Sequence, residues 1–170
     1  KRKGDLHSCI LRHAKFYEDK TGIKIKVEFT GIDIKELDAG EFCNDVTDRK
    51  NRRDILASIH AGNWDFVMIS PPCNTWSSLH MSGFPGPRAL RSMKHPWGVP
   101  DLTPAERRQV EKGSMFIYFT LEVLKAAATA KMSDDWRLCK VVFEHPEFLG
   151  SRRGGDPASV WLLPQVRQVL

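Results

Sequence analysis

The chain has 170 residues, of which 41% are hydrophobic and 28% charged, with a mean hydropathy of −0.37. These values predict one ordinary globular domain over residues 1–170, and they exclude a fibrous or disordered chain. The net charge of +5 at pH 7 favours an anionic partner without identifying one, because a solvated basic surface gives the same excess.

The cysteines predict neither a zinc site nor a disulfide framework. The four are Cys9, Cys43, Cys73 and Cys139; they lie far apart, form no C-x-x-C pair and do not alternate with the six histidines at ligand spacing. We expect all but Cys73 to be small buried side chains. No apolar run is long enough to span a membrane, and no secretory leader is visible. These features predict an intracellular protein without a metal or a membrane partner.

The first part of the chain predicts a helix, a strand and a second helix. Apolar residues recur at helical spacing from Asp5 to Lys20. Alternating apolar and polar residues from Ile23 to Ile34 predict a strand, which places the carboxylate of Asp33 near its carboxyl end. An acidic stretch over residues 44–48 precedes a helix predicted from about Arg49 to His60.

A cysteine on a rigid turn follows the next predicted strand. The apolar run Trp64–Ile69 is typical of a strand that is buried on both faces of a sheet. Pro71 and Pro72 end this strand, because neither residue can donate a hydrogen bond to a neighbouring strand. Cys73 therefore lies at the carboxyl end of a strand, where a thiolate nucleophile would be presented to a substrate.

A long loop and a long helix follow the cysteine. Residues 74–102 are rich in Gly, Pro, Arg and His without clear periodicity, and loops of this length are often functional. Thr103-Pro104-Ala105-Glu106 predicts a capping box with proline at the first helical position. We expect the helix that begins there to reach about Lys131.

The order of the elements predicts an α/β fold. Leu138–Phe143 is a short apolar strand that ends at Glu144, and residues 158–163 predict a last helical segment. Alternating helices and strands predict a mainly parallel sheet with helices on both faces. Ligands of such sheets bind at the carboxyl ends of the strands, where Asp33, Cys73 and Glu144 are expected.

Cys73 and Glu144 would open into one crevice if their strands are neighbours, since adjacent strands lie only about 4.8 Å apart. A free thiol is only slightly ionised at neutral pH, so it needs a nearby cation or hydrogen-bond donors to become a strong nucleophile. The candidate cations in the sequence are His80, Arg88 and Lys94.

Two motifs resemble those of the DNA cytosine-5 methyltransferases. Pro72-Cys73-Asn74-Thr75-Trp76-Ser77 resembles their Pro-Cys-x-x-aromatic-Ser motif. Glu144-His145-Pro146 resembles their Glu-Asn-Val motif and follows in the same order. The resemblance implies the three-layer, Rossmann-like fold of class I methyltransferases, here incomplete at both ends. It also implies S-adenosylmethionine as cofactor and nucleic acid, chiefly DNA, as partner.

The resemblance assigns a role to each of the two motifs. Carbon 5 of cytosine is too electron-poor to accept a methyl group until a nucleophile adds at carbon 6, and Cys73 would be that nucleophile. Glu144 would hold N3 and the exocyclic amine, which stabilises the charge that develops. The target base would have to leave the duplex. A DNA substrate would place the protein in a nucleus or nucleoid.

The family also implies binding residues. Asp33 would bind the ribose hydroxyls of the cofactor and Asp45 its adenine amino group. The implied cofactor-binding residues are Gly4, Asp33, Ile34, Asp45, Val46 and Pro71, and the implied substrate-binding residues are Pro72, Ser77, Arg88, Arg91 and Lys94.

The chain departs from the family at three motifs, one of which has His145-Pro146 in place of Asn-Val, and it shows no separate target-recognition region. The Phe-x-Gly-x-Gly turn that wraps the cofactor is missing, with residues 1–4 as its expected tail. Residues 165–169 resemble the Gln-x-Arg-x-Arg motif, but they follow Glu144 too soon and lack the second arginine, so we interpret them as a helix.

The sequence alone leaves two alternative functions and two roles for one loop open. The chain could be a nucleic-acid-binding domain that has lost catalysis, or a methyltransferase acting on an exocyclic amine without a thiol. The basic segment 86–98 could close over nucleic acid. Taken by itself, the segment is better interpreted as a surface loop whose Trp97 packs on the domain.

Overall fold

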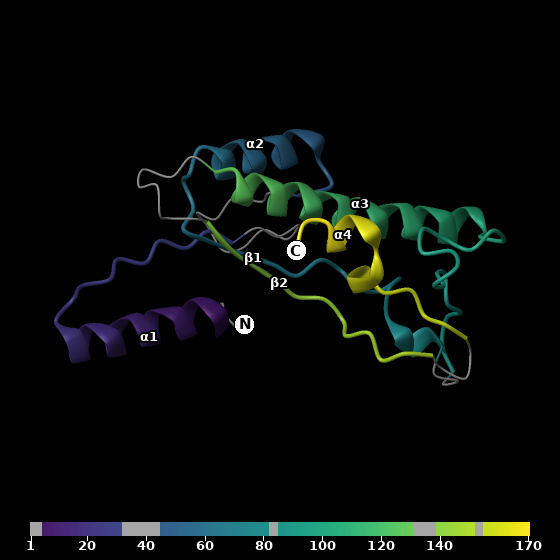
Figure 1. The fold of residues 1–170 in the computed structure, drawn as a ribbon, viewed down its shortest axis with the longest axis horizontal. Helices are drawn as coiled ribbons and strands as arrows, with labels where there is room; N and C mark the ends of the chain where they lie inside the picture. The colour runs from purple at the N-terminus through teal and green to yellow at the C-terminus, as the bar shows by residue number, and fades with distance from the viewer. Residues whose placement is uncertain (1–4, 32–44, 82–84, 131–138, 152–154) are drawn as a thin grey trace. The chain divides into compact units, whose positions relative to one another are not determined.

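The computed structural model describes residues 5–31, 45–81, 85–130, 139–151 and 155–170 (Figure 1). Contacts divide the chain into two compact units, Lys1–Asp45 and Val46–Leu170, and each unit is described by itself. Within the described residues, no helix is both long enough and apolar enough to cross a membrane.

The first unit contains helix α1, Asp5–Thr21, which confirms the helix predicted there. Gly22 ends it with a φ of 71° and donates its backbone N–H to the carbonyl of Glu18 at 2.8 Å. The strand predicted from Ile23 to Ile34 is wrong for its described part, because residues 23–31 form no strand. Alternation gives a segment a strand-like pattern, but only a neighbouring strand can pair its backbone groups. Residues 32–34 lie outside the described part.

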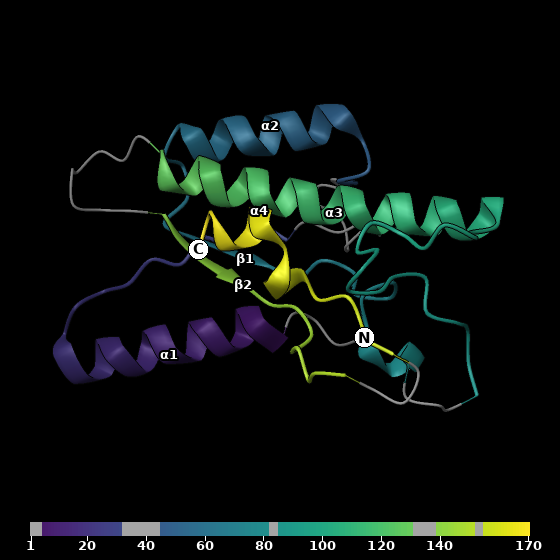
Figure 2. The same cartoon turned by 45° about the vertical axis from the view of Figure 1, so that its right-hand side comes forward.

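The second unit contains two packed helices whose starts the sequence predicted. In α2, Arg49–His60, the carboxylate of Asp48 accepts hydrogen bonds from the first-turn N–H groups of Lys50 and Asn51. The longer α3, Pro104–Ala128, begins with the expected capping box between Thr103 and Glu106. Both views show α2 lying along α3 (Figures 1 and 2), and Ile59, Phe119 and Val123 belong to the core cluster between them.

A two-stranded parallel sheet packs beneath these helices. β1, Phe66–Ile69, pairs with β2, Lys140–Phe143, in the register Phe66↔Lys140 to Ile69↔Phe143, so both predicted strands are confirmed. Val67, Ile69 and Val141 face the core shared with α2 and α3.

Side chains on the other face of this sheet are exposed in the described part of the chain. Phe66 and Met68 are each 46% exposed and Val142 is 45% exposed. The expectation of strands buried on both faces is therefore wrong for the described residues, because an apolar run alone does not specify a second covering layer. The described residues form a mixed helix and strand fold with a small parallel sheet, which is the coarse part of the α/β prediction.

The remaining segments close a second core around Trp76. The predicted helical segment at 158–163 forms as a short 3₁₀ turn, η2, Val160–Leu162, and a single turn of helix α4 follows, Pro164–Arg167. Another 3₁₀ turn, η1, Ser78–Met81, lies in the long loop after Cys73. The buried members of this core are Trp76, Ile117, Leu121, Ala158, Val160, Leu163 and Val166.

Candidate functional site

The pairing of β1 with β2 brings the turns that carry Cys73 and Glu144 to the same edge of the sheet. The N–H of Glu144 donates to the carbonyl of Ile69 at 2.9 Å, which extends the ladder by one residue. The Ser70 hydroxyl donates to a Glu144 carboxylate oxygen at 2.5 Å. The strands of the two motifs are thus neighbours, as the expectation of a shared crevice requires.

Trp76 anchors the turn that carries Cys73. The N–H of Trp76 donates to the carbonyl of Cys73 at 2.8 Å, and the Trp76 side chain is only 3% exposed. Cys73 is half-buried with a free thiol, whereas Thr75 is buried. The chain therefore turns from a partly accessible thiol into the core within three residues.

Arg91 is buried behind this turn, with 2% of its surface exposed. Its guanidinium lies over the ring of Trp76, 4.0 Å from the ring centroid. It donates hydrogen bonds to Thr75 Oγ1 (3.0 Å), Pro96 O (2.7 Å), Val110 O (2.7 Å) and Ser114 Oγ (3.1 Å). All four acceptors are uncharged, and burial lowers the pKa of Arg91 to about 10. The residue that the resemblance assigned to substrate therefore uses its donors inside the fold.

Arg88 is held at the protein surface by two carboxylates. It pairs with Asp101 at 2.7 Å and with Glu106 at 2.8 Å. The hydrogen bond from Arg88 and those from the Thr103 backbone and hydroxyl lower the pKa of Glu106 to about 2. This cluster ties the loop to the first turn of α3, whereas Lys94 is exposed.

The long loop is further fixed to the turn and to α3. The ring nitrogens of His80 contact Asn74 O at 2.6 Å and Pro87 O at 3.2 Å. Trp97 stacks on Tyr118 with ring centroids 4.9 Å apart and an interplanar angle of 8°. It also meets Trp76 edge to face at 5.8 Å. The packing of Trp97 favours the alternative in which this loop is part of the domain.

The sequence marks His145 only as a departure from the Glu-Asn-Val motif of the family, and the structure places it beside the Cys73 turn. It is 7% exposed, and neither ring nitrogen has a hydrogen-bond partner among the described residues. The ring meets Trp76 at 6.3 Å and Phe143 at 6.0 Å. Burial lowers its pKa to about 4, against an opposing effect of Glu144, so the ring is neutral at pH 7. In the sequence, the position of His145 next to Glu144 was the signal that could have placed it in the site.

Gly113 of α3 is a second residue that the sequence did not reveal. A Cβ atom there would lie 2.6 Å from Thr75 Oγ1, 3.1 Å from Arg91 Nη2 and 3.7 Å from Trp76 Nε1. Only glycine lets the turn and the buried guanidinium approach the helix this closely.

Half of the implied cofactor residues lie outside the described part of the chain. Gly4, Asp33 and Ile34 lie outside the described part of the chain, and Asp45 and Val46 fall in different compact units. Pro71 is half-buried. The described residues alone therefore do not define a site for S-adenosylmethionine.

The other implied substrate residues lie near the thiol in sequence. Pro72 is exposed and Ser77 is half-buried, with the Ser77 hydroxyl accepting a hydrogen bond from the Leu79 N–H at 3.3 Å. Across the described ranges, no group of His, Cys, Asp or Glu residues could hold a metal ion. In comparisons with known proteins, no family model, curated protein or solved structure matched the chain.

Proposed function

We propose that Cys73 and Glu144 form the base-reacting half of a cytosine-5 methyltransferase that acts on nucleic acid, with DNA as its first candidate substrate. The observation that carries the proposal is the parallel pairing of β1 with β2. This pairing places the carboxyl ends of the two strands, where the motif turns begin, side by side. The hydrogen bond from Ser70 to Glu144 adds support, because it links the start of the Cys73 turn to the carboxylate.

The proposed chemistry is the addition of a thiolate to cytosine. The Cys73 thiol loses its proton to solvent, a bond forms between Sγ and carbon 6, and the electron pair of the 5,6 double bond moves to carbon 5 and the ring. Glu144 stabilises that charge by holding N3 and the exocyclic amine. S-adenosylmethionine, when bound, would supply the methyl group that the activated carbon 5 accepts. Loss of the proton from carbon 5 to solvent then expels the Cys73 thiolate and restores the 5,6 double bond.

A trapping experiment tests this assignment without the cofactor. The chain is incubated with an oligonucleotide that carries pyrimidin-2-one in place of one cytosine, because this base accepts a thiolate at carbon 6. We expect a covalent adduct that peptide mass spectrometry locates on Cys73. The adduct should be lost in Cys73→Ala, strongly reduced in Glu144→Gln and retained in Cys9→Ala, which serves as the matched control. An adduct that persists in Cys73→Ala would overturn the proposal.

A second candidate is a nucleic-acid-binding domain that lacks catalysis. The absence of a strand over residues 23–31 favours it, because the resemblance implied a cofactor contact at the end of that strand. Calorimetric titration with S-adenosylmethionine separates the two candidates. Saturable binding of the cofactor supports the methyltransferase, whereas binding of DNA without cofactor binding and without an adduct supports the second candidate.

A further inference from the structure

Two basic stretches of the second unit lie outside the site described above. Residues 47–54, which include the first turns of α2, contain four cationic side chains, Arg49, Lys50, Arg52 and Arg53. Residues 107–112 of α3 contain three more, Arg107, Arg108 and Lys112. The same two stretches contain three carboxylates, Asp48, Asp54 and Glu111, so the region carries an excess of positive charge.

The two stretches adjoin in space because Arg52 reaches from α2 to α3. Its guanidinium donates to the carbonyls of Val46 at 2.8 Å and Thr47 at 2.9 Å, and it contacts Met115 Sδ at 3.4 Å. Arg52 thus fixes the segment before α2 against the side of α3.

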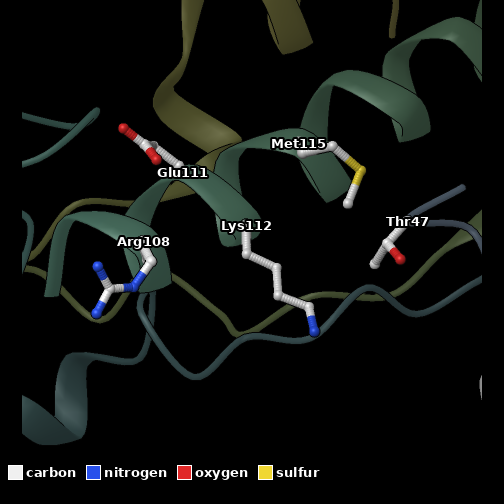
Figure 3. A pocket seen from close by; sticks show the side chains of 5 residues that line it. All are labelled: Thr47, Arg108, Glu111, Lys112 and Met115. Atoms are coloured by element: carbon white, nitrogen blue, oxygen red, sulfur yellow. The ribbon is translucent and has the colours of Figure 1, made fainter. Parts of the chain in front are cut away.

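A shallow depression of about 470 Å³ lies at this junction, lined by Thr47, Arg108, Glu111, Lys112 and Met115. Arg108 and Lys112 are four positions apart, which places them on one face of α3. Figure 3 shows the Arg108 and Lys112 side chains extending from α3 in the same direction, and the Glu111 carboxylate also lines the depression.

The positive charges of Arg108 and Lys112 are not neutralised by ion pairs among the described residues. The salt bridges of the two stretches join Lys50 and Arg53 to the shared carboxylate of Asp54, all of them well exposed. Arg108 and Lys112 are exposed and pair with no carboxylate in that part of the chain. Asp48 is engaged in capping α2. The depression therefore presents two available cations within a wider basic surface.

We propose that this basic depression binds the phosphodiester backbone of a nucleic acid strand, with Arg108 and Lys112 each contacting a phosphate. The inference rests on the proposed function, since it supplies the contact surface that a nucleic-acid-modifying domain needs besides its reacting residues. Cationic side chains that neutralise phosphates release condensed counterions, which makes such binding strongly salt-dependent and largely independent of base sequence. The open shape suits a continuous strand better than an enclosed small molecule.

Binding of fluorescently labelled 20-nucleotide DNA, single-stranded and duplex, tests the proposal by anisotropy across a salt series. We expect Arg108→Gln with Lys112→Gln to weaken binding of both forms by about 10- to 50-fold at 0.15 M salt, and to reduce the slope of log K against log salt by about 2. Lys125→Gln with Lys140→Gln is the matched control, because it removes two exposed cations at other positions. The control should leave the slope unchanged.

The outcomes separate this inference from the proposed function. An equal loss of affinity in both double variants would overturn the depression as a site and assign binding to general charge. Binding to anionic lipid vesicles but not to DNA would also overturn it. If Arg108→Gln with Lys112→Gln loses DNA affinity while no adduct forms at Cys73, the phosphate site stands and the catalytic proposal fails. If the adduct forms at Cys73 and Arg108→Gln with Lys112→Gln leaves the DNA affinity unchanged, the catalytic proposal stands and the phosphate site fails.

Discussion

The Ser70 hydroxyl donates a 2.5 Å hydrogen bond to the Glu144 carboxylate across 74 positions of the chain. Ser70 directly follows β1 and Glu144 directly follows β2, so the bond joins the two motif turns at the place where each leaves the sheet. A carboxylate on an exposed strand end has several rotamers, and a hydrogen bond selects among them. Ser70 is therefore placed to orient the group that the proposed reaction needs.

Replacement of Ser70 by alanine tests this orienting contact. We expect Ser70→Ala to slow adduct formation with the pyrimidin-2-one oligonucleotide by about 3- to 10-fold, the equivalent of the roughly 1 kcal/mol that a typical hydrogen bond contributes. The free energy of unfolding should change little, because the pair is exposed. Ser70→Thr keeps a hydroxyl and should retain the rate. An unchanged rate in Ser70→Ala would show that Glu144 needs no such partner.

Gly113 provides a test of the packing behind the Cys73 turn. Glycine to alanine inside a helix ordinarily stabilises by up to about 1 kcal/mol. Here the new methyl group would lie 2.6 Å from Thr75 Oγ1, so the turn or the helix has to move. We expect Gly113→Ala to destabilise the protein by about 1 to 3 kcal/mol in urea unfolding. Gly86→Ala is the control, since a Cβ there meets nothing within 4 Å; an equally small effect of both would contradict the close approach.

The buried guanidinium of Arg91 should contribute to stability through its hydrogen bonds. Arg91→Met fills a similar volume but leaves the hydroxyl of Thr75 and the carbonyls of Pro96 and Val110 without this donor. We expect a loss of about 2 to 3 kcal/mol in urea unfolding. Arg88→Met removes an exposed arginine from the same loop and should cost clearly less. Equal losses in the two variants would refute the special role of the buried position.

Local patterns were sufficient to predict most helices and both strands of the second unit. The capping box at Thr103 and Glu106 and the apolar run before Pro71 specify structure through neighbouring residues, and both elements formed as predicted. The segment from Ile23 to Gly31 has a strand pattern but no strand, because pairing depends on residues remote in sequence. The coverage of a sheet face is equally non-local.

The closeness of the two motif turns was predictable from the sequence, but the contacts that support them were not. Cys73 and Glu144 follow apolar strands, and strand neighbours carry such residues to one edge. Arg91 lies in a basic, proline-rich stretch that is typical of exposed phosphate contacts. Its burial depends on acceptors at Val110 and Ser114, and the space for them depends on Gly113. No spacing in the sequence reports these long-range contacts.

His145 should make stability depend on pH. Burial lowers the pKa of its ring from 6.5 to about 4 in the folded chain. As the pH falls below 6.5, the unfolded chain takes up the proton first, so stability is fully present above this value and is lost as the pH approaches 4. We expect the free energy of unfolding to fall by about 2 to 3 kcal/mol from this group between pH 7.5 and 4.5.

Urea unfolding of His145→Phe at pH 7.5, 5.5 and 4.5 measures that contribution. Phenylalanine should pack between Trp76 and Phe143 and remove two buried ring nitrogens that lack a partner among the described residues. The variant should therefore equal or exceed the parent in stability at pH 7.5 and lose less of it on acidification. His13→Gln, which changes an exposed histidine of α1, should follow the parent at all three pH values. An unaltered pH slope in His145→Phe would mean that the ring titrates normally and is accessible to water.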